Sequence, residues 1–321
     1  MSTPATRPAR KPQYQRVPIP HRPVAERVRD FSEVAITYTD ADAVVEAQRC
    51  LQCYRPACEE ACPNHNPIKA FLRLVAEGRP EQAAQLLWPH NPLPACTGRV
   101  CAWERQCEGA CPLARKGQAV AIGALERYLA EKGLAHLGLD SQDAAGSLAG
   151  PWPSGRQAIP RGDVAVVGAG PAGLACASTV ALAGLRPVVL DSWVAPGGVM
   201  SYGIPEFVLP KAVLAQEIRR LQRLGVQFVQ QVRVGRDITL EELLAMGFRA
   251  VFVAVGANEP ARAGVPGEDL QGVVSARDFL AEVALGRLRS GPQDGRASHP
   301  PGRPLDGLRV VVIGAGNTAM D

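Results

Sequence analysis

Residues 164–173 read VAVVGAGPAG, an apolar run that leads directly into the spacing G-x-G-x-x-G. The run predicts a buried strand at 164–167, and the apolar pattern that follows predicts a helix over 172–183, closed by Gly184. A second apolar run at 187–190 completes a strand–helix–strand unit. Such a unit is typical of an α/β fold with a parallel, doubly wound sheet.

The glycines of this turn indicate a dinucleotide site. Gly168 allows the tight turn, Gly170 lets the backbone approach a pyrophosphate, and Gly173 lets the helix pack closely on the strand. Asp191 follows about twenty residues later, at the end of the second strand, where its carboxylate can accept a hydrogen bond from a ribose hydroxyl. The predicted site comprises Gly168, Gly170, Pro171, Ala172, Gly173 and Asp191.

The α/β pattern continues after this unit. A helix is predicted over 210–224, and the apolar run 250–255 predicts a buried strand that closes on Gly256, which we include in the nucleotide site. We therefore assign 160–285 to the first part of a Rossmann-like domain.

The glycine signal returns at 309–321. An apolar run at 309–313 predicts another strand, and the glycine spacing follows with alanine in third place: Gly314, Gly316, Asn317 and Ala319. Two dinucleotide loops in one chain indicate a flavin together with a nicotinamide. We assign 306–321 to the beginning of a second Rossmann-like domain. The choice between NADH and NADPH stays open, because the residues that make it would follow residue 321.

Eight of the nine cysteines lie within 62 consecutive residues, ahead of a Gly-, Ser- and Pro-rich boundary at 146–162. They are spaced C-x2-C-x4-C-x3-C-P and then C-x4-C-x5-C-x3-C-P: Cys50, Cys53, Cys58, Cys62, Cys96, Cys101, Cys107 and Cys111. Clustered thiols in a reducing compartment indicate a metal centre, and these spacings are similar to those of iron–sulfur ferredoxins. Structural zinc is the alternative, although zinc sites favour paired C-x2-C steps and only Cys50 and Cys53 form one.

The segment around the cysteines is predicted to be helical. Helices are expected after the cap Thr39, after Asn66 and Pro67, from Pro80, and around Leu125. We therefore expect an all-helical metal-binding domain at 36–150.

Residues 1–35 are predicted to form a basic, proline-rich tail that is extended or disordered and solvated. The tail lacks the apolar core of a signal peptide, and no run approaches the roughly 18 apolar residues of a membrane span. We expect a cytoplasmic protein that binds neither nucleic acid nor membrane.

Five stretches together resemble one family. They are RCLQCYRPACEEAC (49–62), TGRVCAWERQCEGAC (97–111), AVVGAGPAG (165–173), GGVMSYGIPEFVLPK (197–211) and IGAGNTAM (313–320). The family is that of the glutamate synthase small (beta) subunit. The electron-entry parts of dihydropyrimidine dehydrogenase and of ferredoxin:NADP oxidoreductases look similar. The resemblance extends from about residue 30 to residue 321.

The resemblance implies FAD on the first glycine loop, with Gly197, Gly198 and Tyr202 near the flavin, and NAD(P)H on the second. It also implies two 4Fe-4S clusters that share the cysteines crosswise. One set is Cys50, Cys53, Cys58 and Cys111, and the other is Cys62, Cys101, Cys107 and Glu126. Cys96 is predicted to be a bystander, and Cys176 a small buried side chain.

The implied function is oxidation of NAD(P)H by an iron–sulfur flavoprotein that passes electrons through FAD and the clusters to a large catalytic subunit. A second possibility is an electron-entry subunit for pyrimidine reduction or ferredoxin coupling. Since relatives continue beyond the equivalent of residue 321, we also expect a truncated chain, and a third possibility is a noncatalytic module that binds clusters and FAD.

Overall fold

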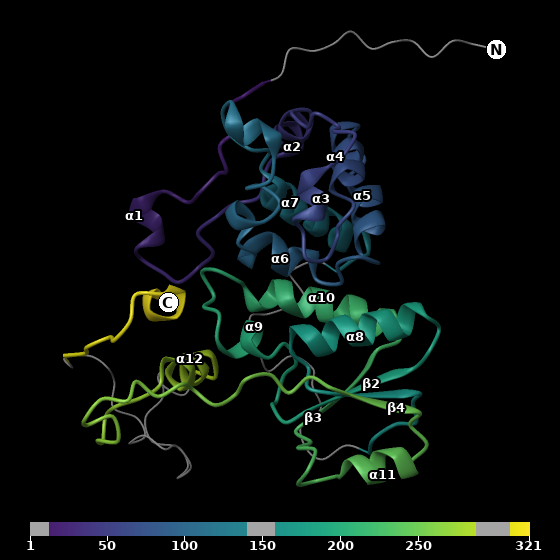
Figure 1. Ribbon diagram of the computed structural model, residues 1–321, viewed down its shortest axis with the longest axis vertical. Helices are drawn as coiled ribbons and strands as arrows, with labels where there is room; N and C mark the ends of the chain where they lie inside the picture. The colour runs from purple at the N-terminus through teal and green to yellow at the C-terminus, as the bar shows by residue number, and fades with distance from the viewer. Residues whose placement is uncertain (1–12, 140–157, 287–308) are drawn as a thin grey trace. The chain divides into compact units, whose positions relative to one another are not determined.

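The computed structural model describes residues 13–139, 158–286 and 309–321. The chain divides into two compact units (Figure 1). The first comprises Met1–Arg22 and Ala35–Leu137, and the second comprises Pro23–Val34 and Gly138–Asp321. Most of the predicted boundary at 146–162 and the proline-rich loop after residue 286 lie outside the described residues.

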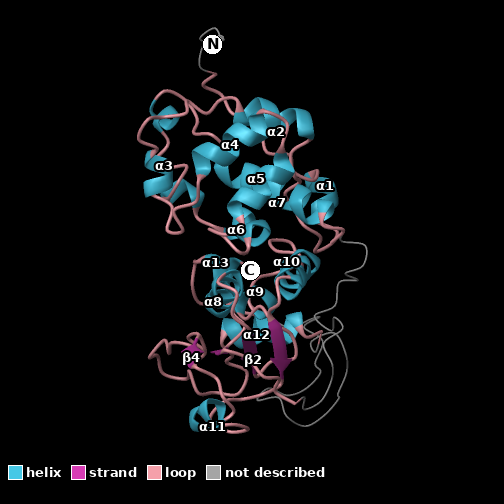
Figure 2. Cartoon of the chain, turned by 90° about the vertical axis from the view of Figure 1, so that its right-hand side faces the viewer, coloured by secondary structure: helices cyan, strands magenta, loops and turns pink. Residues whose placement is uncertain are grey.

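The first unit is built of helices joined by loops (Figure 2). They are α2 (Asp40–Ala47), α3 (Ala57–Glu60), α4 (Ile68–Ala76), α5 (Pro80–Leu87), α6 (Pro94–Val100) and α7 (Ile122–His136), with 3-10 turns at Trp103–Arg105 and Pro112–Arg115. This confirms the predicted helical domain.

Local sequence explains where these helices begin and which faces they bury. The Thr39 side chain accepts a hydrogen bond from Asp42 N and caps α2, and proline is the first residue of α5 and α6. The buried face of α4 recurs at helical spacing: Ile68, Phe71, Leu72 and Val75. Burial of each such side chain contributes about 1.5–3 kcal/mol.

The second unit contains a parallel sheet between helices. Its elements are α1 (Val24–Arg27), β1 (Val164–Val167), α8 (Pro171–Leu182), β2 (Pro187–Asp191), α9 (Val199–Tyr202), α10 (Lys211–Arg223), β3 (Gln227–Gln230), α11 (Leu240–Ala245), β4 (Ala250–Val253), α12 (Ala276–Ala284) and α13 (Asn317–Met320). The strand order is β3-β2-β1-β4, with Val166 opposite Val189 and Phe252. Helices α8 and α10 cover one face and α11 the other (Figures 1 and 2). The predicted α/β fold is confirmed.

Helix α11 was not predicted although the sequence carries a signal for it. The Thr239 side chain accepts from Glu242 N, and the Glu242 carboxylate accepts from Thr239 N, which together form a capping box at the start of α11. The T-x-x-E spacing could have predicted this start.

Two predicted strands differ in the structure. The run at 250–255 is a strand only at Ala250–Val253, and it is not buried: Phe252 is 41% and Val253 58% exposed. The reason is that β4 lies at the edge of the described sheet, with β1 as its one neighbour there. The run at 309–313 forms no strand, and Val311 is 85% exposed. A strand needs hydrogen bonds from a neighbour, and the described residues supply none to this run.

The described helices include none that is both long and apolar enough to cross a bilayer.

Candidate cluster and nucleotide sites

Four cysteines of the first unit line one small cavity: Cys50, Cys53, Cys58 and Cys111. Cys50 follows α2, Cys58 lies in α3 and Cys111 precedes a 3-10 turn, so the cavity joins loops that are far apart in sequence. The rest of the wall is mainly apolar: Leu51, Pro56, Ala57, Leu72, Pro112, Val120 and Ile122, with Lys69 the one charged residue. Four soft donors in an apolar cavity suit an iron–sulfur cluster.

Burial disfavours the thiolate form in this cavity. It raises the pKa of Cys50, and it raises the pKa of Cys58 to about 12, with repulsion from the neighbouring thiols as a further cause. A bound cluster supplies the positive iron centres that stabilise deprotonated sulfur, so cluster binding would release protons here.

A second set of donors gathers around α7. Burial raises the pKa of Cys101 to about 11 and also raises the pKa of Cys107, and in both cases the negative charges of Glu126 and Cys62 add to the effect. These electrostatic contacts bring together the four residues that the resemblance had grouped. Three thiols and one carboxylate could hold a cluster with one oxygen ligand.

The Glu126 carboxylate is buried and surrounded by hydrogen-bond donors. Asn91 Nδ2 donates to Oε1 at 3.0 Å, the Thr97 hydroxyl donates to the same oxygen, and Asn66 Nδ2 donates to Oε2 at 3.4 Å. The buried Oδ1 of Asn66 has no hydrogen-bond partner in the described part of the chain. These three residues were missed because no motif links them to Glu126.

The other two cysteines do not line the thiol cavity. Cys96 is buried within α6, and Cys176 is a half-buried residue of α8. Across residues 13–139, 158–286 and 309–321, no three His, Cys, Asp or Glu side chains form a group that could hold a single metal ion. All nine cysteines are free thiols.

The glycine loop after β1 forms one wall of a cavity of about 940 Å³ in the second unit. The predicted residues that line it are Gly168, Gly170, Pro171, Ala172, Asp191, Gly198, Tyr202 and Gly256. Gly173 and Gly197 lie behind this surface. A Cβ at Gly173 would collide with the carbonyl of Gly168, and Gly197 has a φ of +122°. Both glycines therefore shape the wall from behind.

Asp191 ties the glycine loop to the second strand. Its Oδ2 accepts from Ala169 N at 2.6 Å and its Oδ1 accepts from Trp193 N at 2.8 Å. Burial raises the pKa of Asp191, while these two amide hydrogen bonds oppose the shift. A carboxylate has about four acceptor positions, so it can still accept from a ribose hydroxyl.

The cavity contains further groups suited to a dinucleotide. The rings of Trp193 and Tyr202 stack with centroids 4.3 Å apart and planes inclined by 30°, and both residues line the cavity. Three guanidinium groups line the same cavity and could pair with phosphate: Arg233, Arg236 and Arg277. Trp193 and the arginines carry no local motif, so the sequence did not reveal them.

The second glycine loop is not enclosed. Gly314, Gly316, Asn317 and Ala319 lead into α13, and all but the half-buried Ala319 are exposed. Neither the thiol-lined cavity nor the glycine-loop cavity includes them.

Comparison with known families agrees with the division of the chain into a helical unit and an α/β unit. Residues 27–137 match the family described as dihydropyrimidine dehydrogenase domain II, 4Fe-4S cluster, and residues 162–321 match pyridine nucleotide-disulphide oxidoreductase. The first unit is therefore similar to 4Fe-4S cluster proteins and the second unit to pyridine-nucleotide oxidoreductases, which agrees with the thiol-lined cavity and the glycine-loop cavity. The zinc alternative is thereby set aside.

The chain is a homologue of the glutamate synthase small chains over most of this chain's own length. It is 39% identical to the glutamate synthase [NADPH] small chain of Halomonas elongata over 94% of this chain and 60% of that one. The corresponding Escherichia coli protein is 38% identical over 96% of this chain and 61% of its own. UacF of Escherichia coli is also 38% identical, over 92% of this chain and 44% of its own. The chain spans about three fifths of the length of these small chains.

Proposed function

We propose that this chain is part of the electron-entry subunit of a glutamate synthase. In this proposal electrons pass from NADPH through FAD to two 4Fe-4S clusters and on to a large catalytic subunit. The observation that carries it is the presence, in one chain, of two four-donor sets in a helical unit and a glycine-loop cavity in an α/β unit.

Each residue set has a defined task in this proposal. Cys50, Cys53, Cys58 and Cys111 hold one cluster, and Cys62, Cys101, Cys107 and Glu126 hold the other. The amide groups of the turn at Gly168–Gly173 and the start of α8 bind the FAD pyrophosphate, and Asp191 binds a ribose hydroxyl. When bound, FAD accepts a hydride from the nicotinamide and releases single electrons.

The compartment and the partner belong to the same proposal. Nine free thiols suit a reducing compartment, which places the protein in the cytoplasm. The large subunit is suggested by the names of the small-chain relatives, whereas equal identity to UacF keeps an electron-entry role with another partner as the alternative. Affinity capture of the chain from its native cells, followed by identification of the bound proteins, separates the two.

The cofactor assignment is tested by anaerobic expression of residues 1–321. We expect about eight irons, about eight sulfides and one FAD per chain. Zinc in place of iron would overturn the cluster sets, and a flavin-free protein would overturn the assignment of the first glycine loop.

A second candidate function is a cluster- and FAD-binding module that does not itself oxidise NAD(P)H. The exposure of Gly314, Gly316 and Asn317 favours it. Anaerobic addition of NADPH or NADH decides between the two functions: rapid bleaching of the flavin absorbance supports the electron-entry role, and an unchanged spectrum supports the module.

A further inference from the structure

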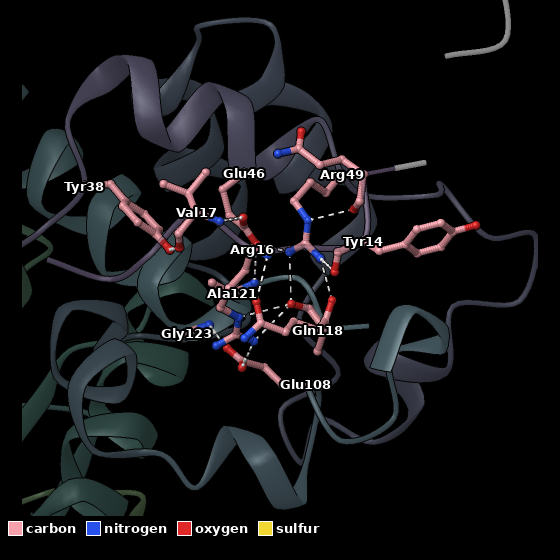
Figure 3. A network of polar contacts seen from close by, with 12 residues as sticks. Tyr14, Arg16, Val17, Tyr38, Glu46, Arg49, Glu108, Gln118, Ala121 and Gly123 are labelled. Carbon is pink, nitrogen blue, oxygen red and sulfur yellow. Dashed lines mark hydrogen bonds and ion pairs between the residues drawn. The ribbon is translucent and has the colours of Figure 1, made fainter. Parts of the chain in front are cut away.

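Residues 13–17 lie across the helical unit and are held there by side chains of three other segments (Figure 3). Tyr14 O accepts from Gln118 N at 2.9 Å, Arg16 N donates to Gln118 Oε1 at 3.0 Å, and Tyr38 Oη donates to Val17 O at 2.7 Å. The sequence had predicted a solvated arm here. We call residues 13–17 the strap.

The strap closes over a buried ion pair. The side chains of Glu46 and Arg49 are fully buried and lie 2.5 Å apart. Glu46 Oε2 accepts from Val17 N at 2.7 Å, and its Oε1 accepts from Ala121 N at 2.8 Å. Arg49 donates to Tyr14 O at 3.1 Å. One ion pair therefore fixes the strap and the start of α7 together.

Arg16 extends the network to the second cysteine loop. Its Nη2 lies 2.8 Å from Glu108 Oε2, and Glu108 is only 4% exposed. The other carboxylate oxygen of Glu108 accepts from Gly123 N at 3.1 Å, in the first turn of α7 (Figure 3). Arg16 also donates to Ala119 O at 3.0 Å. Glu108 thus joins the strap, the cysteine loop and α7.

The sequence positions of these residues give the network its significance. Glu108 directly follows Cys107, and Gly123 lies three residues before Glu126. Both neighbours belong to the second proposed cluster set. From this placement we infer that Arg16 and Glu108 are positioning residues. They hold Cys107 and Glu126 at the relative positions that the second cluster requires. The inference rests on the proposed ligand sets.

Loss of Arg16 would disturb this network at Glu108. A buried carboxylate without its cation is strongly unfavourable, so Glu108 would turn toward water. That movement would weaken the hydrogen bond from Gly123 N and shift the Cys107 loop relative to α7. Arg16 meets the Cys50 end of the network indirectly, through the Ala119 carbonyl that also accepts from Arg49, so we expect the first cluster to be little affected.

The test uses the cluster-loaded chain and begins by assigning its signals. Electron paramagnetic resonance spectra of the reduced protein are recorded for Cys53→Ser and Cys107→Ser. If the two variants disturb different signals, the ligand sets stand; if they disturb the same one, the proposed sets fail, irrespective of the strap.

Arg16→Gln is then compared with Arg79→Gln. This control breaks the exposed ion pair between Arg79, which directly precedes α5, and Glu77. We expect Arg16→Gln to shift the spectrum and reduction midpoint of the Cys107-assigned signal only. Arg16→Lys should return most of that signal to its parental spectrum and midpoint. Arg79→Gln should change neither signal. Unchanged signals in Arg16→Gln, or equal changes in both, would overturn the inference. If Arg16→Gln does not fold, Glu108→Gln decides: a shift confined to the Cys107-assigned signal supports positioning, and an unaltered spectrum refutes it.

Discussion

Glu46 and Arg49 form an ion pair with 2.5 Å between Oε1 and Nη1, and both side chains are completely buried. The pair lies at the end of α2, directly before Cys50. Its remaining polar atoms form hydrogen bonds with backbone groups of residues that are distant from the pair in sequence: Gln13, Tyr14, Val17, Gln118, Ala119 and Ala121. A buried pair with this many hydrogen bonds organises the loops around it.

Glu46→Ala is expected to destabilise the protein by about 3–5 kcal/mol, because it leaves the Arg49 guanidinium buried without a counter-charge. Urea denaturation of the cluster-loaded protein measures the change. Glu77→Ala is the matched control, since it breaks the exposed pair with Arg79 and should cost no more than about 1 kcal/mol. Equal effects of the two substitutions would contradict the prediction.

Cys96→Ala is expected to retain the iron of both clusters, because Cys96 is buried within α6, does not line the cavity of the first set and is not a member of the second proposed set. Cys101→Ala should lose iron from one cluster. Iron and sulfide assays on anaerobically purified protein make the comparison. Loss of iron in Cys96→Ala would mean that the second set uses a different fourth ligand.

Thr97→Val is expected to weaken iron retention at the Glu126 set by about 10–100-fold, the usual effect of removing a group that orients a metal ligand. Valine keeps the shape of threonine but cannot donate to the Glu126 carboxylate. Iron release to a chelator is the measurement. Thr179→Val, at an exposed position of α8, should release iron at the parental rate.

Gly173→Ala is expected to weaken FAD binding by roughly 10–100-fold, because a Cβ would collide with the carbonyl of Gly168 and displace the loop at a cost of about 1–3 kcal/mol. Flavin fluorescence on titration of the flavin-free protein measures the affinity. Gly316→Ala is the control, since a Cβ there meets no atom within 4 Å. If both substitutions weaken FAD equally, the flavin is not on the first loop.

Asp163 is expected to titrate far below an ordinary aspartate. Hydrogen bonds from the Arg186 guanidinium, at 2.9 and 3.1 Å, lower the pKa of Asp163 to about 2. A carboxyl whose pKa is depressed by folding stabilises the native state above its unfolded pKa of about 3.9, and that contribution is lost as the pH falls toward 2. A carbon-13 NMR titration should find the low midpoint, and Arg186→Gln should return it toward the ordinary value.

Much of the fold could be predicted because its signals are local. The strand at 164–167, the starts of α2 and α5, and the glycine loop each depend on residues within a few positions of one another. The predicted burial of the strand at 250–255 and the predicted strand at 309–313 were wrong for the opposite reason. Their burial and pairing depend on neighbours in space, and an apolar run does not specify which neighbours the chain supplies.

The sequence by itself determined the chemistry of this protein: cysteines at iron–sulfur spacing and a glycine turn followed by Asp191. Only the tertiary structure revealed the groups around that chemistry. Arg16 and Glu108 are 92 residues apart, and Glu46 and Ala121 are 75 apart. Asn91 and Thr97 meet Glu126 only because α7 packs against the segment that carries them. Polar contacts over such separations depend on helix packing, which sequence spacing does not encode.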